Sequence, residues 1–548
     1  MWPRSSTRRW PPWSHPLPDR GTPLPATDLW SGYATDGFFD EAIGADGNVR
    51  EAYRAVVDWF AGLDAGAMRE LERHQIDSFR GQGITFTVYG GTEGTERTWP
   101  MDLFPRIIAA DEWSRVERGL VQRVTALNRF LEDLYVGEQA VLHDGIVPRW
   151  LVSSSDGFER EAVNISVPHG ARCLVAGIDV VRDHQGTYRV LEDNLRNPSG
   201  ISYVLENRAA MTRVLPSAFT DHAVRSVDHY GRSLLAALRS VAPPACGDNP
   251  CVVVLTPGVY NSAYFEHAFL ARQMGVELVE GRDLVVDDNV VAMRTTHGLE
   301  RVDVIYRRID DAFLDPVVFD PSSTLGVPGM MAAARAGTVT IANAVGNGVG
   351  DDKAIYPYVG ELIRYYHGEE PILDNVETYL LWDDDQRAEV MGRLDQLVIK
   401  PVAEAGGYGI VIGPKATDAE LAEVAAKVEA DPRNWIAQEV VALSRMPAWT
   451  GERMAGRHLD LRPFVLTGEH TEVIPGGLTR VAMREGSLIV NSSQGGGSKD
   501  TWVLLPERER LAKSESDAAE AVAEDDTGAE MAAVAASDIG QSARPGAS

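Results

Sequence analysis

The pattern of hydrophobic and polar positions predicts a chain that mixes helices with strands. Apolar residues recur at helical spacing in residues 53–74, 111–135, 264–274 and 418–429. Short apolar or alternating runs predict strands at 83–89, 177–181, 187–191, 251–255, 276–279, 397–402, 409–412, 435–441, 459–466 and 487–490. The order strand, loop, helix, strand across 251–279 predicts a small parallel α/β subdomain. The fold class expected is therefore α+β with an α/β subdomain.

Composition divides the chain into a folded body between two unlike ends. Residues 1–27 are rich in Pro and Arg without periodicity, and 507–548 end in an acidic tail, so we expect a disordered arm and a disordered tail. The Pro, Gly and Asn of 241–250 predict a boundary loop. The expected domains are 28–240, 241–350 and 351–506.

The net charge is strongly negative and belongs to the body. The 548 residues contain 52 Lys and Arg against 80 Asp and Glu, a net charge of −28, of which −24 lies between residues 28 and 513. This argues against a nucleic-acid partner, since phosphate binding needs Lys and Arg to displace counterions. No apolar run is long enough to cross a membrane and no secretion signal is apparent, so we expect a cytoplasmic protein without a membrane partner.

The three cysteines carry little chemistry. Cys173, Cys246 and Cys251 are too few and too unevenly placed for a disulfide framework or a zinc site. Buried, inert thiols are the simplest interpretation.

Three oxygen-bearing residues in a predicted hairpin suggest a magnesium site. If Arg182 pairs with Thr187, Asp179 lies opposite Val190, and Glu192 and Asn194 point to the same face as Asp179. Oxygen donors of this kind suit Mg²⁺. A shift of one residue in the register would put Asp179 on the other face. The alternative is a solvated hairpin face with ordinary acids.

A lysine followed by a glycine-rich turn suggests a phosphate site. Lys400 ends a predicted strand, and Gly406, Gly407 and Gly409 free the next turn to approach an anion with its amides. The spacing matches neither a P-loop nor a dinucleotide fingerprint. A plain tight turn is the alternative.

Further candidates follow along the chain. The strand at 435–441 holds Gln438 and Glu439, which could face an adenine and a ribose, while Arg462, Arg480 and Lys499 are cations beside glycine-rich turns. Each cation alone is as well explained by a surface salt bridge. Together they predict an anion pocket.

Taken in order, these motifs resemble the ATP-grasp superfamily of carboxylate-amine ligases. GIDVVRDHQGTYRVLEDNLRNPSG resembles its metal-binding end, LVIKPVAEAGGYGIVIG its phosphate-covering hairpin, AQEVV its adenine hinge, and DLRPFVL with TRVA its arginine-bearing strands. Here the metal motif comes first, and moving the first block behind residue 505 restores the usual order. The match is therefore to the circularly permuted type-2 ATP-grasp proteins, which include glutathionylspermidine-synthase-like sequences, over residues 28–506.

The resemblance implies a fold, an activity and a set of roles. It implies that 28–240 combines a helical region with the permuted metal-binding part, that 241–350 is the pre-ATP-grasp domain, and that 351–506 binds nucleotide. It implies an ATP-dependent ligase that joins a carboxylate to an amine through an acylphosphate, with ATP and Mg²⁺ as cofactors. The implied roles are metal binding by Asp179, Glu192 and Asn194; ATP binding by Lys353, Lys400, Gly406, Gly407, Gly409, Gln438, Glu439 and Val441; and catalysis by Arg462, Arg480 and Lys499.

Substrates and partners follow less directly. The resemblance implies a small-molecule or peptide carboxylate and an amine, in a peptide-modifying setting with transglutaminase-like or α-helical partner proteins. Several related ligases carry Arg two residues before the metal Asp, where this chain has Gly177. Arg172, Arg196, Arg462 or Arg480 could supply that cation. A nucleotide-binding scaffold with little turnover, or a phosphotransferase, remains the alternative function.

Overall fold

A large sheet organises the computed structural model, which describes residues 22–89, 94–216, 219, 223–403, 409–487, 490, 496–507 and 509. Within these residues, ten strands form the sheet along the main order β13-β5-β4-β19-β22-β23-β3, with β18 on β19 and with β20 joining β4 to β21. Their bounds are β3 (Met101–Ile108), β4 (Val175–Arg182), β5 (Tyr188–Asn194), β13 (Asp374–Asn375), β18 (Arg445–Trp449), β19 (Met454–Arg462), β20 (Phe464–Thr467), β21 (Thr471–Val473), β22 (Leu478–Val481) and β23 (Gly497–Val503).

This sheet joins segments that are far apart in sequence. β4 and β5 form an antiparallel hairpin from the first third of the chain, and β4 pairs with β19 and β20 from the last third. β23 then runs parallel to β3 at the edge of the main path. The predicted metal hairpin and the predicted arginine strands therefore lie side by side.

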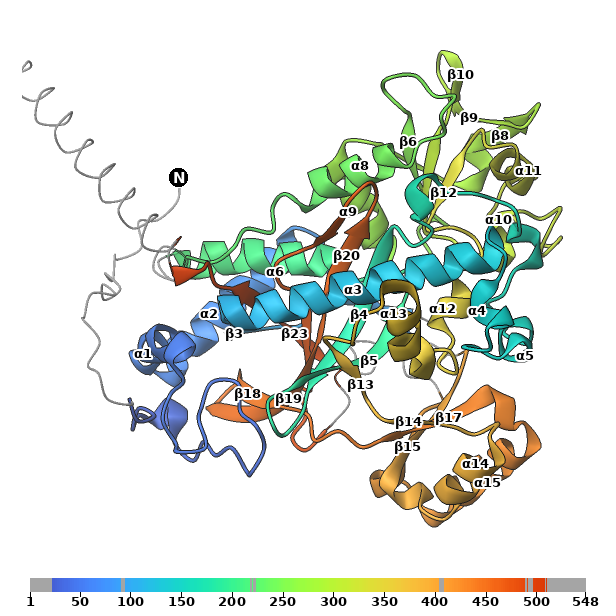
Figure 1. The fold of residues 1–548 in the computed structure, drawn as a ribbon. Coiled ribbons are helices and arrows are strands. Elements are labelled where there is room, and N and C mark those ends of the chain that lie inside the picture. The colour runs from blue at the N-terminus through green and yellow to red at the C-terminus, as the bar shows by residue number, and fades with distance from the viewer. Residues whose placement is uncertain are drawn as a thin grey trace, which may run out of the picture.

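Long helices cover the sheet. α3 (Ala110–Tyr135) crosses it in Figure 1, and its apolar side chains Leu127 and Leu131 share one buried cluster with Ile178 and Val180 of β4. α6 (Ile201–Val214) packs on β23, and α13 (Val359–His367) packs on α3. The remaining helices of this part are α1 (Arg54–Ala61), α2 (Ala65–Gly81), α4 (Ala140–His143), α5 (Arg149–Ser153) and α12 (Gly348–Asp351), with the small hairpin β1 (Thr85–Tyr89) and β2 (Gly94–Thr98).

A second unit contains the predicted parallel subdomain. Its four strands are all parallel in the order β12-β11-β6-β7, with bounds β6 (Val252–Leu255), β7 (Glu277–Val279), β11 (Val304–Arg307) and β12 (Thr340–Ala342). An antiparallel sheet of β8 (Leu284–Asp287), β9 (Val290–Thr295) and β10 (Gly298–Arg301) adjoins it. Its helices are α8 (Tyr230–Ser240), α9 (Tyr264–Met274), α10 (Asp311–Leu314) and α11 (Met330–Arg335).

A third, smaller lobe has its own core. The antiparallel order β14-β17-β15-β16 comprises β14 (Thr378–Leu380), β15 (Leu397–Pro401), β16 (Val411–Ile412) and β17 (Trp435–Glu439). α14 (Asp384–Met391) and α15 (Asp418–Ala430) accompany it, and Figure 1 shows this lobe in orange below the main sheet. Thr417 and Glu420 begin α15 with a reciprocal capping box. Leu397, Ile399, Val424 and Ala437 form a buried cluster separate from the two larger ones.

The structure changes some predicted elements. The helical pattern over 53–74 contains two helices, α1 and α2, because the chain breaks at Gly62 and Asp64 caps the second helix. The predicted strand 459–466 is two strands interrupted at Pro463, which has no amide hydrogen to donate. The predicted strand 487–490 lies partly outside the described residues. Of the predicted ends, residues 22–27, 507 and 509 are described, and Pro23 forms a bridge with Asn48.

Candidate functional site

The β4–β5 hairpin brings the three predicted metal ligands to one face. The predicted register is wrong: Arg182 pairs with Tyr188, not Thr187, and Asp179 lies opposite Glu192, not Val190. A bulge after Asp179 accommodates one extra residue of β5. Because of this extra residue, Glu192 points to the same face as Asp179, although the register differs from the predicted one. Directly opposed residues share a face, so Asp179 and Glu192 point the same way, as does Asn194 opposite Gly177.

Two arginines form ion pairs with the carboxylate of Asp179. Arg462 Nε lies 2.5 Å from Oδ1 and its Nη2 lies 2.8 Å from Oδ2, while Arg480 Nη2 lies 2.7 Å from Oδ2. Asp179 is 3% exposed. Burial alone would raise its pKa, but the charges of Arg462 and then Arg480 outweigh burial and hold the pKa well below its usual range. Asp179 is therefore ionised and clamps both arginines to the hairpin.

The second arginine also pairs with Asp460. Arg480 Nε lies 2.9 Å from Asp460 Oδ1, and the register places these two residues opposite each other on β22 and β19. Burial opposes the charge of Arg480, but Asp179 and then Asp460 raise its pKa above the ordinary value. This buried network fixes two guanidinium groups beside the predicted metal ligands.

The missing arginine at Gly177 has a steric explanation. A Cβ atom there would lie 2.8 Å from Pro198 Cβ and 3.3 Å from Arg462 Cδ. The side chain of Arg462, coming from β19, fills the space above Gly177. A cation reaches this region from another strand, which sequence spacing alone does not reveal.

The small lobe contributes Lys400 from β15. This side chain is 7% exposed, and its Nζ donates to Gln438 Oε1 at 2.5 Å. Burial lowers the pKa of Lys400 to about 8, while Glu192 and Asp179 act in the opposite direction. Gln438 in turn donates to Thr378 Oγ1 at 3.0 Å. Lys400 therefore lies within electrostatic reach of the carboxylates of the hairpin.

Lys353 joins the same region. Its Nζ lies 3.2 Å from Glu192 Oε1, whose side chain is 24% exposed. The backbone amide of Lys353 donates to Val402 O, just beyond β15, at 3.3 Å. The structure thus brings together Asp179, Glu192, Lys353 and Lys400, with Asn194 on the same strand face as the two acids. The side-chain amide nitrogen of Asn194 is buried without a partner within the described residues.

Other predicted nucleotide residues border this cluster. Glu439 Oε1 accepts from Tyr379 OH at 2.9 Å and from Arg393 Nη2 at 2.5 Å. Val441 is half-buried just after β17. Gly409 adopts φ +70°, the left-handed conformation that glycine tolerates best. Gly406 and Gly407 lie outside the described residues.

Lys499 is placed differently from the other predicted cations. Lys499, on β23, lies opposite Thr479 of β22, whereas its neighbour Ser498 lies opposite Arg480. Lys499 therefore points to the face of the sheet away from Arg480. Its Nζ pairs with Asp102 and donates to Phe104 O at 3.0 Å and Pro447 O at 2.9 Å. The structure does not bring it together with Arg462 and Arg480.

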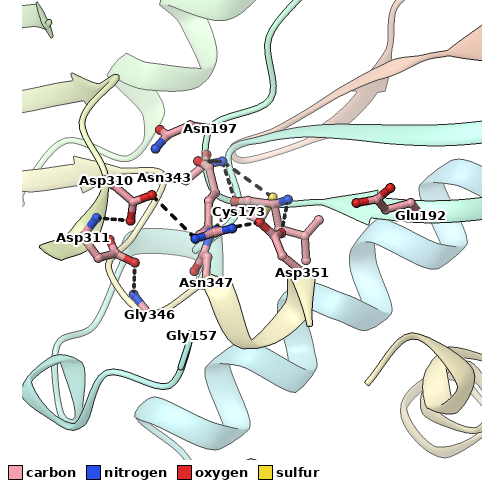
Figure 2. Close-up of polar contacts among 12 residues, drawn as sticks. Gly157, Cys173, Glu192, Asn197, Asp310, Asp311, Asn343, Gly346, Asn347 and Asp351 are labelled. Carbon is pink, nitrogen blue, oxygen red and sulfur yellow. Dashed lines mark hydrogen bonds and ion pairs between the residues drawn. The ribbon is translucent and has the colours of Figure 1, made fainter. Parts of the chain in front are cut away.

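The sequence interpretation missed a cluster of polar residues next to the end of β5. Figure 2 shows Asp351, Asn343 and Asn347 there. Asp351 accepts from Leu195 N and, at 2.8 Å, from Arg196 Nε, while Asn343 Nδ2 donates to Leu195 O at 2.8 Å. The glycines and acids of Gly346–Lys353 were the available signal, a dense run that no predicted element used.

The chemical types of the predicted ligands suit magnesium. Two carboxylates and an amide on one face are hard oxygen donors, which Mg²⁺ prefers. Both oxygens of Asp179 already pair with arginines, whereas Glu192 is partly exposed. Within the described ranges, no group of three or more His, Cys, Asp or Glu is placed to hold a metal. The predicted set contains only two such residues, so Asn194 would have to complete it.

The site lies between a large sheet and a small antiparallel lobe. The lobe contributes a buried lysine, and the sheet contributes acids and paired arginines. This is the arrangement of an ATP-grasp protein. The chain belongs to the circularly permuted ATP-grasp type 2 family, whose sequence profile matches residues 105–482. This confirms the predicted family and the predicted fold class. It also explains why the predicted metal hairpin precedes the lysine strand.

Several relatives match most of the chain. An uncharacterised protein of Mycobacterium tuberculosis is 54% identical over 499 residues, 90% of each chain. One of Synechocystis is 53% identical over 474 residues, 86% of this chain and 98% of that protein. A Frankia casuarinae protein named "Putative glutamate--cysteine ligase 2-2" is 46% identical over 466 residues, 85% of this chain but 53% of that longer protein.

A solved structure supports the fold alone. The apo form of a glutathione synthetase-like effector, GSS30, from Globodera pallida aligns with a TM-score of 0.52 at 11% identity, over 81% of this chain and 98% of that one. Separately, the helices in the described part of the chain include none long and apolar enough to cross a membrane.

Proposed function

We propose that this chain is an ATP-dependent ligase that joins a carboxylate to an amine through an acylphosphate. The observation that carries the proposal is the convergence of Lys400 and Lys353 on the face that holds Asp179, Glu192 and Asn194. The family, and the ligase names of two Frankia relatives that are each about half matched by this chain, support this class of enzyme.

Each part of the site has a role in this proposal. Lys400 and the turn that includes Gly409 bind the phosphates, with Gln438, Glu439 and Val441 beside the adenine and ribose. Glu192 and Asn194, with Asp179, would hold Mg²⁺, which neutralises phosphate charge and aligns the γ-phosphoryl group when bound. Arg462 and Arg480 supply fixed positive charge next to the transferred group.

The chemistry balances in two steps. A carboxylate oxygen attacks the γ-phosphorus of ATP, the bond from that phosphorus to the bridging oxygen breaks, and ADP leaves. The amine nitrogen then attacks the acyl carbon, the acyl C–O bond to phosphate breaks, and inorganic phosphate leaves as the amine gives up a proton. Both arginines are held by carboxylates before substrate arrives, so little reorganisation is needed as negative charge develops.

The substrates are a carboxylate and an amine, either of which can belong to a peptide. A setting with transglutaminase-like or α-helical partner proteins is part of the same proposal and follows from the resemblance alone. Pull-down of such partners by the purified chain would test it.

The test is trapping of the acylphosphate. The purified chain is incubated with Mg·ATP, hydroxylamine and a panel of carboxylates, and mass spectrometry follows hydroxamate and ADP. The ligase gives both in equal amounts, and Glu192→Gln lowers both together when Mg²⁺ is limiting. A phosphotransferase would give a stable phosphorylated product instead. A protein that binds Mg·ATP but releases no ADP with any carboxylate would be a scaffold, and the proposal would fail.

A further inference from the structure

A polar cavity lies immediately beside the proposed phosphate site. It has a volume of about 60 Å³, several times the space that one buried water needs. Its lining includes Arg196, Asp351 and Val402, which stand two residues from Asn194, Lys353 and Lys400 respectively. The three segments that carry the proposed ATP site therefore each contribute a wall.

Arg196 is the guanidinium that lines this cavity. Its Nε donates to Asp351 Oδ2 at 2.8 Å, and its Nη1 lies 3.6 Å from Asp310 Oδ2, beyond hydrogen-bond distance. Its two Nη groups make no hydrogen bond within the described residues, and its side chain is 29% exposed. A guanidinium with both Nη groups available suits a bidentate carboxylate.

The other candidate arginines are already engaged. Arg172 is 1% exposed and donates to Ile165 O at 2.8 Å and Val345 O at 2.9 Å. Arg462 and Arg480 hold Asp179 through short ion pairs. Of the four arginines that could replace the one missing at Gly177, Arg172 lines a separate cavity, and Arg196 is the one that lines the polar cavity beside the proposed phosphate site.

Two of the acids that line the cavity are already paired. Asp352 accepts from Ser155 Oγ at 2.7 Å and from Arg433 Nη2 at 2.8 Å, so its charge is already compensated. Asp351 is paired with Arg196 itself. Asp156 is exposed and makes no hydrogen bond or ion pair in the part of the chain that the structure describes. A guanidinium whose two Nη groups make no hydrogen bond to the described residues and one unpaired carboxylate therefore line the same cavity.

Two glycines allow close backbone packing in the wall of the cavity. A Cβ at Gly157 would lie 2.1 Å from the carbonyl carbon of Gly348, and a Cβ at Gly348 would lie 3.1 Å from Arg196 Cδ. The backbones touch because neither residue has a side chain, and the aliphatic part of Arg196 packs on them. This contact limits where the guanidinium can point.

We propose that this cavity binds the carboxylate substrate and that the substrate is a free amino acid. The Nη groups of Arg196 bind the carboxylate beside the γ-phosphate, and Asp156 receives the ammonium group of the same molecule. The inference rests on the proposed ligase function and adds the substrate class and the residues that select it.

The experiment uses the full chain, Mg·ATP and hydroxylamine. Each standard L-amino acid is compared with the carboxylic acid that lacks its amino group, for example alanine with propionate, and hydroxamate is measured. We expect an amino acid to be preferred. Arg196→Gln should raise the KM for that amino acid by about 10- to 100-fold while the KM for ATP changes less than about twofold. Asp156→Asn should weaken the preference over the deaminated acid by about fivefold.

Controls separate binding from folding. Arg364→Gln removes an exposed arginine of α13 that pairs with Glu370, and it should leave both KM values unchanged. Arg196→Lys should restore part of the affinity, because it keeps the charge but loses the planar fork. If Arg196→Gln binds Mg·ATP normally and keeps the wild-type KM for the carboxylate, the inference is wrong while the ligase function stands. If the wild type prefers deaminated acids, the substrate class is wrong. If no carboxylate supports ADP release, both proposals fail.

Discussion

Lys400 and Lys499 are two buried lysines that serve different purposes. Both are strand residues with less than a tenth of their surface exposed, and burial lowers the pKa of both. Lys499 has a carboxylate and two carbonyl groups as partners. Within the described residues Lys400 makes one side-chain hydrogen bond, to the neutral Gln438. The first lysine is fully paired within the protein, and the second retains donors for a ligand.

The comparison shows how to separate structural from functional cations. Burial and charge are shared, so neither identifies a binding site. The number of donors left unused is the informative property, because a buried ammonium without an opposite charge is costly unless a ligand supplies it. The predictions below test this difference, from the largest expected effect to the smallest.

Lys499→Met should destabilise the protein by about 3–5 kcal/mol, since it leaves Asp102 buried without its cation. The free energy of unfolding in urea measures this. Lys427→Met, in an exposed pair with Glu423 on α15, is the matched control and should cost less than about 1 kcal/mol. A Lys499→Met protein that keeps its stability but no longer binds Mg·ATP would place Lys499 in the nucleotide site and remove the distinction.

Lys400→Met should leave the free energy of unfolding within about 1 kcal/mol of wild type, because no carboxylate among the described residues lies within hydrogen-bond distance of Lys400. It should weaken Mg·ATP binding by about 100-fold, the loss of charge-assisted bonds to phosphate. Calorimetric titration of the wild type and the variant measures the affinity. Unchanged affinity would show that Lys400 does not contact the nucleotide.

Glu192→Gln should raise the Mg²⁺ concentration needed for half-maximal ADP release by about tenfold, because it removes a carboxylate ligand. Its stability should change little, since Glu192 is partly exposed and its ion pair in the described part of the chain is the one with Lys353 at 3.2 Å. Titration with Mg²⁺ at fixed ATP measures the effect. Glu423→Gln is the control, and an equal shift in that variant would point to bulk charge instead of a metal site.

The pH dependence of binding gives the smallest effect. With the pKa of Lys400 lowered to about 8, its protonated form dominates at neutral pH and is lost as pH rises through that value. Only the protonated form attracts phosphate, so the Kd for Mg·ATP should rise by roughly fourfold between pH 7 and pH 8.5. The same titration of Lys400→Met should be flat. A wild-type affinity that is constant across this range would contradict the assignment.

Local patterns predicted much of the fold and the centre of the site. The helices at 264–274 and 418–429 and the strand that carries Lys400 follow from periodicity and capping, which nearby residues determine. The order of the motifs indicated the circular permutation, and the family match confirms it. Short stretches of sequence determine these helices and strands, and the motif order is read directly along the chain, so both can be predicted without knowing the fold.

Other features depend on distant partners. The face on which Lys499 lies is set by how β23 pairs with β22, and its carboxylate comes from β3, almost four hundred residues earlier in the chain. The space at Gly177 is filled by Arg462 from another strand. Neither follows from spacing, because each requires knowing which strands become neighbours.

The bulge in the β4–β5 hairpin has a consequence for how this protein can diverge. It absorbs one residue, and that single residue decides whether Asp179 shares a face with Glu192. A single deletion in β5 would therefore disable the site unless a second length change in the same hairpin compensated for it. We expect functional homologues to gain or lose residues here only in matched pairs, a constraint on insertions and deletions that conservation of the two acids alone would not reveal.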